Sequence, residues 1–173
     1  IKLFVEQPKD ENGNRIYSYQ VEGGESDNAS VEAMMNLPSD LTVFALHSHG
    51  SDMAVNRLLD RVYSVYTTTP CTVANEFRYS FLLNSEQLVY YHPIKNESSS
   101  WADIISYTDQ LYHYAFTASF VENYWAKLHR FEETKTFVYF NTCSAMSPQG
   151  RPIGDAVFRA GASLFAGWTY RSL

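Results

Sequence analysis

The sequence predicts an α/β fold, a sandwich with a mostly parallel central sheet and inserted β-hairpins. Three short and nearly continuous apolar runs carry this prediction, at Leu41–Leu46, Thr136–Phe140 and Gly161–Trp168. Such runs are typical of strands that are buried on both faces, as in parallel sheets. Segments with apolar residues at helical spacing lie between them, and this alternation of strands and helices favours a parallel sheet with helical crossovers.

Two further pairs of segments resemble hairpins. Ile1–Glu6 and Ile16–Val21 have strand-like patterns and are separated by turn-forming residues that include Asn12-Gly13,. Phe77–Leu83 and Gln87–His92 form the second expected pair. We therefore expect one hairpin before the first buried strand and another between the first two buried strands.

Four segments are expected to be helical from their apolar spacing and their boundaries. They are Ser30–Met35, Val55–Tyr66, a long helix over Trp101–His129 with a break near 117–119, and a short helix over Gly154–Arg159,. No linker long enough to divide the chain is visible, so residues 1–173 are expected to form a single domain. Because the chain begins without Met and stops soon after the third buried run, we expect an excised or C-terminally incomplete piece.

Composition excludes several classes of partner. The formal net charge is −6 and the cationic residues are scattered, which argues against nucleic acid and against an anionic membrane surface,. No apolar run reaches the about 20 residues that a transmembrane helix needs. Two cysteines are too few for a disulfide scaffold, so one reactive and one structural thiol is the simplest reading,. The sequence indicates no cofactor and leaves the compartment unknown.

Two buried strands each end in a residue able to do chemistry. The first is followed by His47-Ser48-His49-Gly50, and the second by Asn141-Thr142-Cys143. If these strands are neighbours, His49 and Cys143 emerge at the same sheet edge, where the sites of open α/β sheets lie. A thiolate nucleophile with an imidazole base requires this arrangement. The N–H groups of Gly50 and Cys143 are the expected oxyanion donors.

These residues resemble the signatures of the caspase-like clan of cysteine peptidases, which includes caspases, gingipains, clostripain, separase and CHAT domains. Ser48-His49-Gly50 is similar to its His motif, and 141–145 (NTCSA) occupies the position of its Cys motif. The run 154–168 (GDAVFRAGASLFAGW) resembles the CHAT pattern of a short helix, an Ala-Gly-Ala turn and a strand that leads to Trp. The resemblance covers 41–50 and 136–168, and it implies a caspase-like sandwich that hydrolyses peptide bonds through an acyl-enzyme.

The same resemblance implies a substrate pocket beside the cysteine. Its expected residues are Ser144, Ala145, Asp155, Ala166, Gly167 and Trp168. Asp155 and Asp52 are the candidate acids for a basic substrate residue before the scissile bond, which the CHAT and separase relatives favour. Arg151 and Arg159 are the candidate bases for an acidic one. We expect a protein or peptide substrate, and a regulatory domain or partner chain would suit this class.

Two other readings stay open. His47 and His49 have the spacing of metal ligands on one strand and, with Asp52 or Asp60, define a metal-dependent hydrolase as one alternative,. This would resemble the JAMM metalloproteases, although Gly50 stands where that pattern has Pro. The other alternative is a catalytically silent caspase-like domain that serves as an interaction module. Cys71 is expected to be a structural thiol, as are most buried cysteines.

Overall fold

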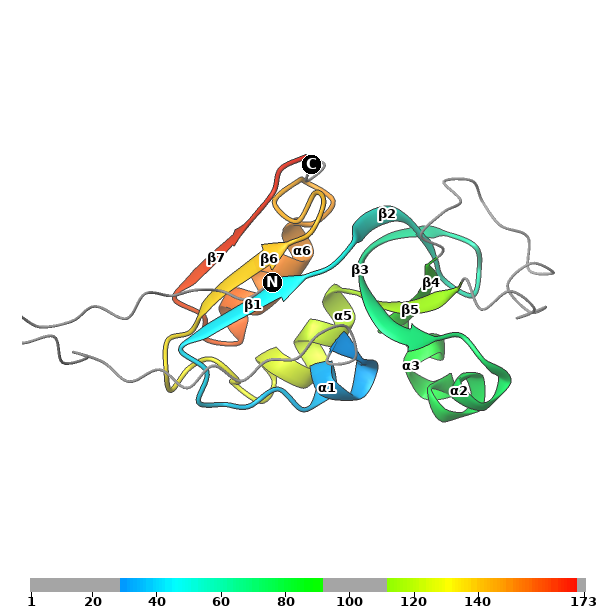
Figure 1. Cartoon of the computed structure of the whole chain (residues 1–173), viewed down its shortest axis with the longest axis horizontal. Helices are drawn as coiled ribbons and strands as arrows, with labels where there is room; N and C mark the ends of the chain where they lie inside the picture. The colour runs from blue at the N-terminus through cyan, green and yellow to red at the C-terminus, as the bar shows by residue number, and fades with distance from the viewer. Residues whose placement is uncertain (1–28, 92–111, 171–173) are drawn as a thin grey trace, which may run out of the picture.

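The computed structural model describes residues 29–91 and 112–170, which form a mixed α/β fold with two sheets (Figure 1). The described strands are β1 (Val43–His47), β2 (Gly50–Val55), β3 (Arg61–Pro70), β4 (Leu88–Tyr91), β5 (His113–Phe116), β6 (Phe137–Asn141) and β7 (Leu164–Gly167). The described helices are α1 (Val31–Met35), α2 (Val73–Arg78), α3 (Ser80–Asn84), α5 (Ala118–Val121), the π-helical turn η2 (Glu122–Ala126) and α6 (Arg151–Arg159).

The first sheet is parallel, with the strand order β1-β6-β7. Strand β6 lies in the middle, and its residues pair in register with both neighbours, from Val43↔Phe137 to His47↔Asn141 on one side. These three strands are the three apolar runs of the sequence, so the parallel sheet and its strand positions are confirmed. The expected hairpin over 1–21 lies outside the described residues.

One face of the parallel sheet packs against helices, and the other is more open. Phe140 and Phe165 point inwards, where the Phe165 ring lies against Gly154 of α6. The Phe44 ring contacts Trp125 of η2 with a centroid separation of 5.7 Å. On the opposite face Val43 and Leu164 are each 53% exposed. Among the described residues, helices therefore cover one face only, and the second helical layer of a sandwich is not seen.

The second sheet is antiparallel and closes on itself in the order β2-β3-β5-β4, because β4 also pairs with β2 through Tyr90 and Val55. One of its faces joins the main core through Val65, Tyr114 and Phe116. The other face encloses a smaller core. Figure 1 shows this sheet beside the parallel one, with α2 and α3 at one end of it.

The expected helix over Val55–Tyr66 is wrong, since the segment contains the end of β2, the turn over 56–60 and the first part of β3. Asn56 makes the turn: its Oδ1 accepts hydrogen bonds from the N–H groups of Leu58 and Asp60, both at 2.9 Å. This Asx arrangement reverses the chain. The following Tyr and β-branched residues of 61–70 then favour an extended strand. The apolar residues of this segment thus match a helical spacing although they belong to the end of β2, the turn and the start of β3.

The expected strand over Phe77–Leu83 is also wrong, because α2 and α3 occupy it. Thr72 caps α2, as its hydroxyl accepts the Asn75 N–H at 3.2 Å, and this local cap outweighs the strand-like composition,. Within Trp101–His129 the described residues form β5 and then, after Thr117, the helical turns α5 and η2. The expected long helix is therefore wrong over His113–Phe116, which is a strand, and right over Ala118–Ala126; its first part, 101–111, lies outside the described residues.

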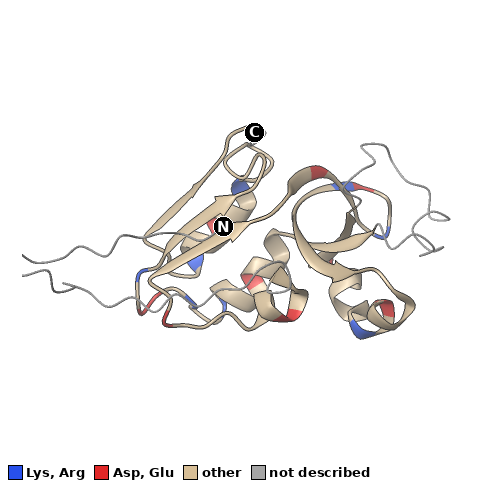
Figure 2. Cartoon of the chain, viewed as in Figure 1, with Lys and Arg blue, Asp and Glu red and all other residues tan. Residues whose placement is uncertain are grey.

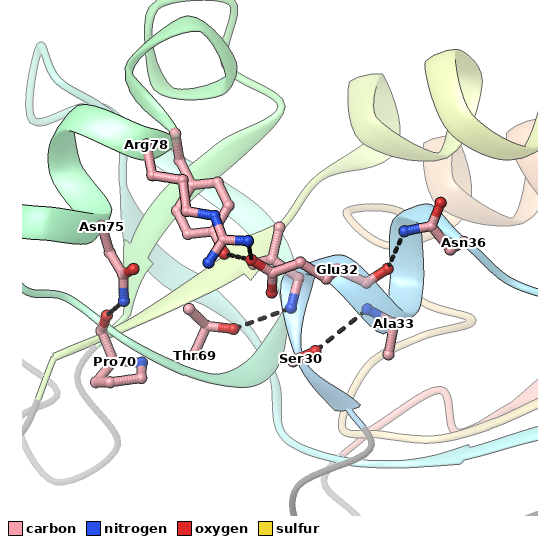
Figure 3. A network of polar contacts seen from close by, with 10 residues as sticks. Ser30, Glu32, Ala33, Asn36, Thr69, Pro70, Asn75 and Arg78 are labelled. Carbon is pink, nitrogen blue, oxygen red and sulfur yellow. Dashed lines mark hydrogen bonds and ion pairs between the residues drawn. The ribbon is translucent and has the colours of Figure 1, made fainter.

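Helix α1 is attached to the second sheet by polar contacts (Figure 3). Its first N–H, from Val31, donates to Thr69 Oγ1 of β3 at 2.9 Å, and Ser30 caps the helix. Glu32 forms an ion pair with Arg78 of α2 at 3.0 Å. These contacts confirm the short helix predicted at Ser30–Met35 and explain its placement.

Charged residues of both signs are dispersed over the described ribbon (Figure 2). The Lys and Arg positions of the described ribbon do not gather in one place (Figure 2), and the net charge of the whole sequence is −6. None of the described helices has both the length and the apolar character needed to cross a membrane.

Candidate functional site

The link between the two sheets is two residues long, and His49 lies in it. β1 ends at His47 and β2 begins at Gly50, so the chain leaves the parallel sheet and enters the antiparallel one through Ser48 and His49. The Ser48 N–H donates to the Asn141 carbonyl at 3.3 Å, and its hydroxyl donates to the Tyr66 carbonyl at 2.7 Å. Ser48 therefore bonds to both sheets, and this fixes the backbone that carries His49.

The register of β1 and β6 carries the two strand ends to the same edge. His47 pairs with Asn141, the last residues of the two strands, and Cys143 follows two residues after Asn141, as His49 follows His47. Close packing continues beyond the strands: a Cβ placed on Gly50 would lie 2.4 Å from the Cys143 carbonyl oxygen. The backbone that follows His49 thus lies directly against the backbone of Cys143.

The two cysteines differ in environment, and neither forms a disulfide. Cys143 is partly exposed, whereas Cys71 is 1% exposed. Burial raises the pKa of Cys71 well above its ordinary value, and the nearby Glu76 carboxylate acts in the same direction,. Cys71 is therefore unsuited to nucleophilic chemistry, whereas Cys143 is the less buried of the two cysteines.

The turn that carries Cys143 is sharply bent. Ser144 has a φ of +58°, in the left-handed region that side-chain-bearing residues seldom adopt,. The Ser144 N–H donates to the Tyr170 carbonyl and the Met146 N–H to the Trp168 carbonyl, both at 2.9 Å. The turn is thereby joined to the segment that follows β7.

Tyr63 of β3 reaches this turn from the other sheet. Its hydroxyl donates to the Cys143 carbonyl oxygen at 2.7 Å, a contact between residues 80 positions apart in sequence. Burial raises the pKa of Tyr63 to about 12; the Thr142 hydroxyl opposes this rise, whereas the charges of Cys143 and Asp52 add to it,. Sequence reasoning missed Tyr63 because the segment was expected to be helical.

A cluster of rings lies beside His49. Its imidazole meets Tyr66 edge to face with a centroid separation of 6.0 Å, and Tyr66 in turn contacts Tyr91 at 5.5 Å and His113 at 5.0 Å. Burial is the main cause that raises the pKa of Tyr91, and the charge of Cys143 is the next. These rings all come from the antiparallel sheet, which therefore forms a wall on the His49 side of the Cys143 turn.

His47 has different partners from His49. Trp168 Nε1 donates to Asn141 Oδ1 at 2.7 Å, and Asn141 Nδ2 lies 2.6 Å from His47 Nδ1. Because the indole can only donate, the amide oxygen faces Trp168 and the amide nitrogen donates to His47. A neutral His47 consequently carries its proton on Nε2. Within 29–91 and 112–170, no three His, Cys, Asp or Glu residues are grouped as metal ligands.

Some of the expected pocket residues lie at the Cys143 turn, and others are buried or belong to β7. Ser144 and Trp168 are at the turn, where Trp168 is 46% exposed, whereas Ala145 is buried and its Cβ would lie 2.8 Å from a Cβ on Gly167. Ala166 is the β7 partner of Tyr139 and is partly exposed.

Three of the four charged candidates lie on α6, and the fourth lies on β2. Asp155 faces Arg151 on α6 at 3.8 Å, and Arg159 pairs with Glu122 of η2. Asp52, which is exposed on β2, acts on the Tyr63 hydroxyl. Of the four charged candidates, Asp52 is thus the one with a described interaction at the Cys143 turn.

Comparisons with models of protein families, with curated proteins and with solved structures found no match to this chain.

Proposed function

We propose that this chain is a cysteine endopeptidase domain of the caspase-like class, in which Cys143 is the nucleophile and His49 the general base. The observation that carries the proposal is the paired register of β1 and β6, with Gly50 packed on the Cys143 carbonyl. This puts the imidazole-bearing link and the thiol-bearing turn at one sheet edge, as a Cys–His dyad requires.

The reaction follows from these roles. His49 accepts the thiol proton, and the Cys143 sulfur attacks the carbonyl carbon of the scissile peptide bond. The tetrahedral intermediate collapses when the imidazolium gives its proton to the leaving amine, and a thioester remains. Water, deprotonated by His49, then attacks the thioester, releases the carboxylic acid product and returns the thiol.

The pairing of β2 with β3 supports Gly50 as an oxyanion donor. Tyr66 donates its N–H to the His49 carbonyl at 2.8 Å, so the His49–Tyr66 pair is of the hydrogen-bonded kind,. The next pair, Gly50–Val65, is then of the other kind, in which the N–H points away from the neighbouring strand,. The Gly50 N–H is therefore not used in the β2–β3 ladder, which leaves it for another acceptor, as the proposed oxyanion role requires,.

The substrate residue before the scissile bond is selected by the charge beside the Cys143 turn. A basic side chain is our expectation, and Asp52 is the acid best placed to receive it, given its interaction with Tyr63 at the turn. Asp52→Asn should then lower kcat/KM for Arg or Lys substrates relative to neutral ones. Equal rates on both substrates in wild type and Asp52→Asn would contradict this preference.

The test of the dyad is the rate of iodoacetamide labelling of both cysteines, measured by mass spectrometry across pH. We expect Cys143 to react well below the ordinary thiol pKa of about 8.5 and to lose this reactivity in His49→Ala. His129→Ala, which removes an exposed imidazole from another part of the chain, is the matched control. A peptide library then tests cleavage, with Cys143→Ser as the inactive reference.

Other results would point to the alternatives. If Cys143 reacts as an ordinary thiol and His49→Ala changes nothing, the peptidase proposal fails and a silent interaction domain is favoured. Hydrolysis that survives Cys143→Ser but is lost with a chelator or in His47→Ala would instead favour the metal-dependent reading.

A further inference from the structure

The peptide group that follows the nucleophile is bonded at both of its ends. Its carbonyl oxygen, on Cys143, accepts the Tyr63 hydroxyl at 2.7 Å, and its N–H, on Ser144, donates to the Tyr170 carbonyl at 2.9 Å. One bond comes from the antiparallel sheet and the other from the segment after β7. Because both ends are bonded, the plane of this peptide cannot rotate without breaking one of them.

This restraint acts on a strained backbone. Ser144 has a φ of +58°, and a residue with a side chain remains in this region only when its surroundings enforce it,. Gly150 adds to the enforcement, since a Cβ there would lie 2.5 Å from the Ser144 carbonyl oxygen. Loss of one bond lets the turn relax, and the direction of the Cys143 side chain changes with the backbone that carries it.

The Tyr63 hydroxyl has little freedom to bond elsewhere. Tyr63 is 8% exposed, and Gly50 packs against its hydroxyl so closely that a Cβ would lie 2.6 Å from it. Burial raises the pKa of this phenol to about 12, so it remains a donor at every pH at which a thiolate nucleophile operates,. The charge of Cys143 is among the causes of that rise, so the two groups lie close enough to influence each other.

We propose that Tyr63 is a positioning residue for the nucleophile: its hydroxyl, through the Cys143 carbonyl, fixes the bent turn that directs the thiol to His49. This inference rests on the proposed cysteine-peptidase function. It assigns a role in that site to a strand of the antiparallel sheet, outside the segments that resemble the caspase-like signatures.

Tyr63→Phe tests the role, because it removes the hydroxyl and keeps the ring. Tyr90→Phe is the matched control: it also removes a buried hydroxyl of the antiparallel sheet, one that donates to Glu76 at 2.8 Å. The readouts are the pH profile of Cys143 alkylation and the separate values of kcat and KM on a peptide substrate found in the library. A general loss of stability would change the alkylation profile in both variants, whereas a loss of positioning changes it in Tyr63→Phe and not in Tyr90→Phe.

We expect alkylation of Cys143 at neutral pH to fall about tenfold to a hundredfold in Tyr63→Phe, with kcat lowered and KM little changed. The pH midpoint should move towards that of an ordinary thiol, and Tyr90→Phe should keep the wild-type profile. A second variant, with p-aminophenylalanine in place of Tyr63, restores a donor at the same place and should recover much of the rate. If Tyr63→Phe does not fold, p-fluorophenylalanine in place of Tyr63 fills the space of the hydroxyl without a donor, and it should show the same slow alkylation.

The outcomes separate the two proposals. Wild-type alkylation that needs His49, together with an unchanged profile in folded Tyr63→Phe, would overturn the role of Tyr63 and leave the peptidase intact. So would a wild-type rate in the p-fluorophenylalanine variant, which has no donor, when Tyr63→Phe does not fold. A wild-type Cys143 without His49-dependent reactivity would remove the proposed function and this inference with it.

Discussion

The most direct test of the site geometry is Gly50→Ala, which adds a single methyl group between the two sheets. The new Cβ would lie 2.4 Å from the Cys143 carbonyl oxygen, 2.6 Å from the Tyr63 hydroxyl and 3.1 Å from the Thr142 Cβ. Real Cβ atoms essentially never approach other heavy atoms within 3.0 Å, so the Cys143 oxygen must retreat by about 0.6 Å,. Cys143 is thus displaced by a change at a residue that need not touch the thiol.

The magnitude follows from these distances. Overpacking of this kind typically costs about 1–3 kcal/mol. For a chain of this size that corresponds to a fall in Tm of about 2–12 °C. The Tyr63 hydroxyl must retreat from the same Cβ by about 0.4 Å, and when both oxygens move out to 3.0 Å their 2.7 Å hydrogen bond lengthens to about 3.2 Å, beyond the usual range for O–H···O contacts,. We therefore expect both lower stability and slower alkylation of Cys143.

The assay measures Tm and the Cys143 alkylation rate at neutral pH in the same samples. Gly154→Ala is the control, because it crowds the core elsewhere: a Cβ there would lie 2.9 Å from the Phe165 ring, on α6. The control should leave Cys143 alkylation unchanged whatever happens to its Tm. If Gly50→Ala keeps both the Tm and the alkylation rate of wild type, the close packing of Gly50 on Cys143 is wrong and the site geometry with it.

Three further predictions concern stability and are measured by urea unfolding. Trp125→Ala should cost about 3–5 kcal/mol, since this fully buried indole also donates to the Met34 carbonyl; a loss under 1 kcal/mol would contradict its place in the core,. Glu76→Gln should cost about 1–3 kcal/mol, because it removes the charge paired with Arg57, and the Arg57→Gln variant should lose a similar amount,. The pKa values of Cys71 and Tyr63 are higher in the folded chain than in the unfolded one, so the unfolded chain loses both protons at lower pH,. The free energy of unfolding should therefore fall above about pH 8.5 because of Cys71. It should fall again between about pH 10 and 12 because of Tyr63, by about 2–3 kcal/mol,. Cys71→Ala should remove the first fall, and a flat profile between pH 7 and 12 would refute the argument.

The parallel sheet could be predicted because its strands are marked locally. Each is a short run of apolar residues bounded by polar or turn-forming ones, and β1, β6 and β7 need no information from elsewhere in the chain,. The same local marks located His49 and Cys143 at strand ends. That β1 and β6 are neighbours was a condition of the prediction, and the register of the two strands meets it.

The antiparallel sheet could not be predicted in the same way. Its strands β2 and β3 are short or mixed in composition, and together they imitate the spacing of one helix. The decisive residue was Asn56, whose side chain accepts hydrogen bonds across the turn, but an Asn within such a segment is compatible with a helix or with a turn,. For β5, pairing with both β3 and β4 outweighed a helical pattern, a tertiary effect that single-sequence propensity does not contain,.

Tyr63 illustrates why the site was found only in part. A catalytic pair at the ends of two apolar strands has a signature in each strand, whereas a hydrogen bond across 80 residues has a signature in neither. The Tyr63 hydroxyl can be assigned as the donor only when the turn at Asn56 and the pairing of β3 with β2 are known. The link of Ser48 and His49 then joins the sheet that supplies Cys143 to the sheet that supplies Tyr63. The geometry of the proposed nucleophile therefore depends on both sheets, although the motifs seen in the sequence lie at the end of the parallel one. A substitution in the hairpin of β2 and β3 can consequently displace Cys143 while both motifs stay unchanged.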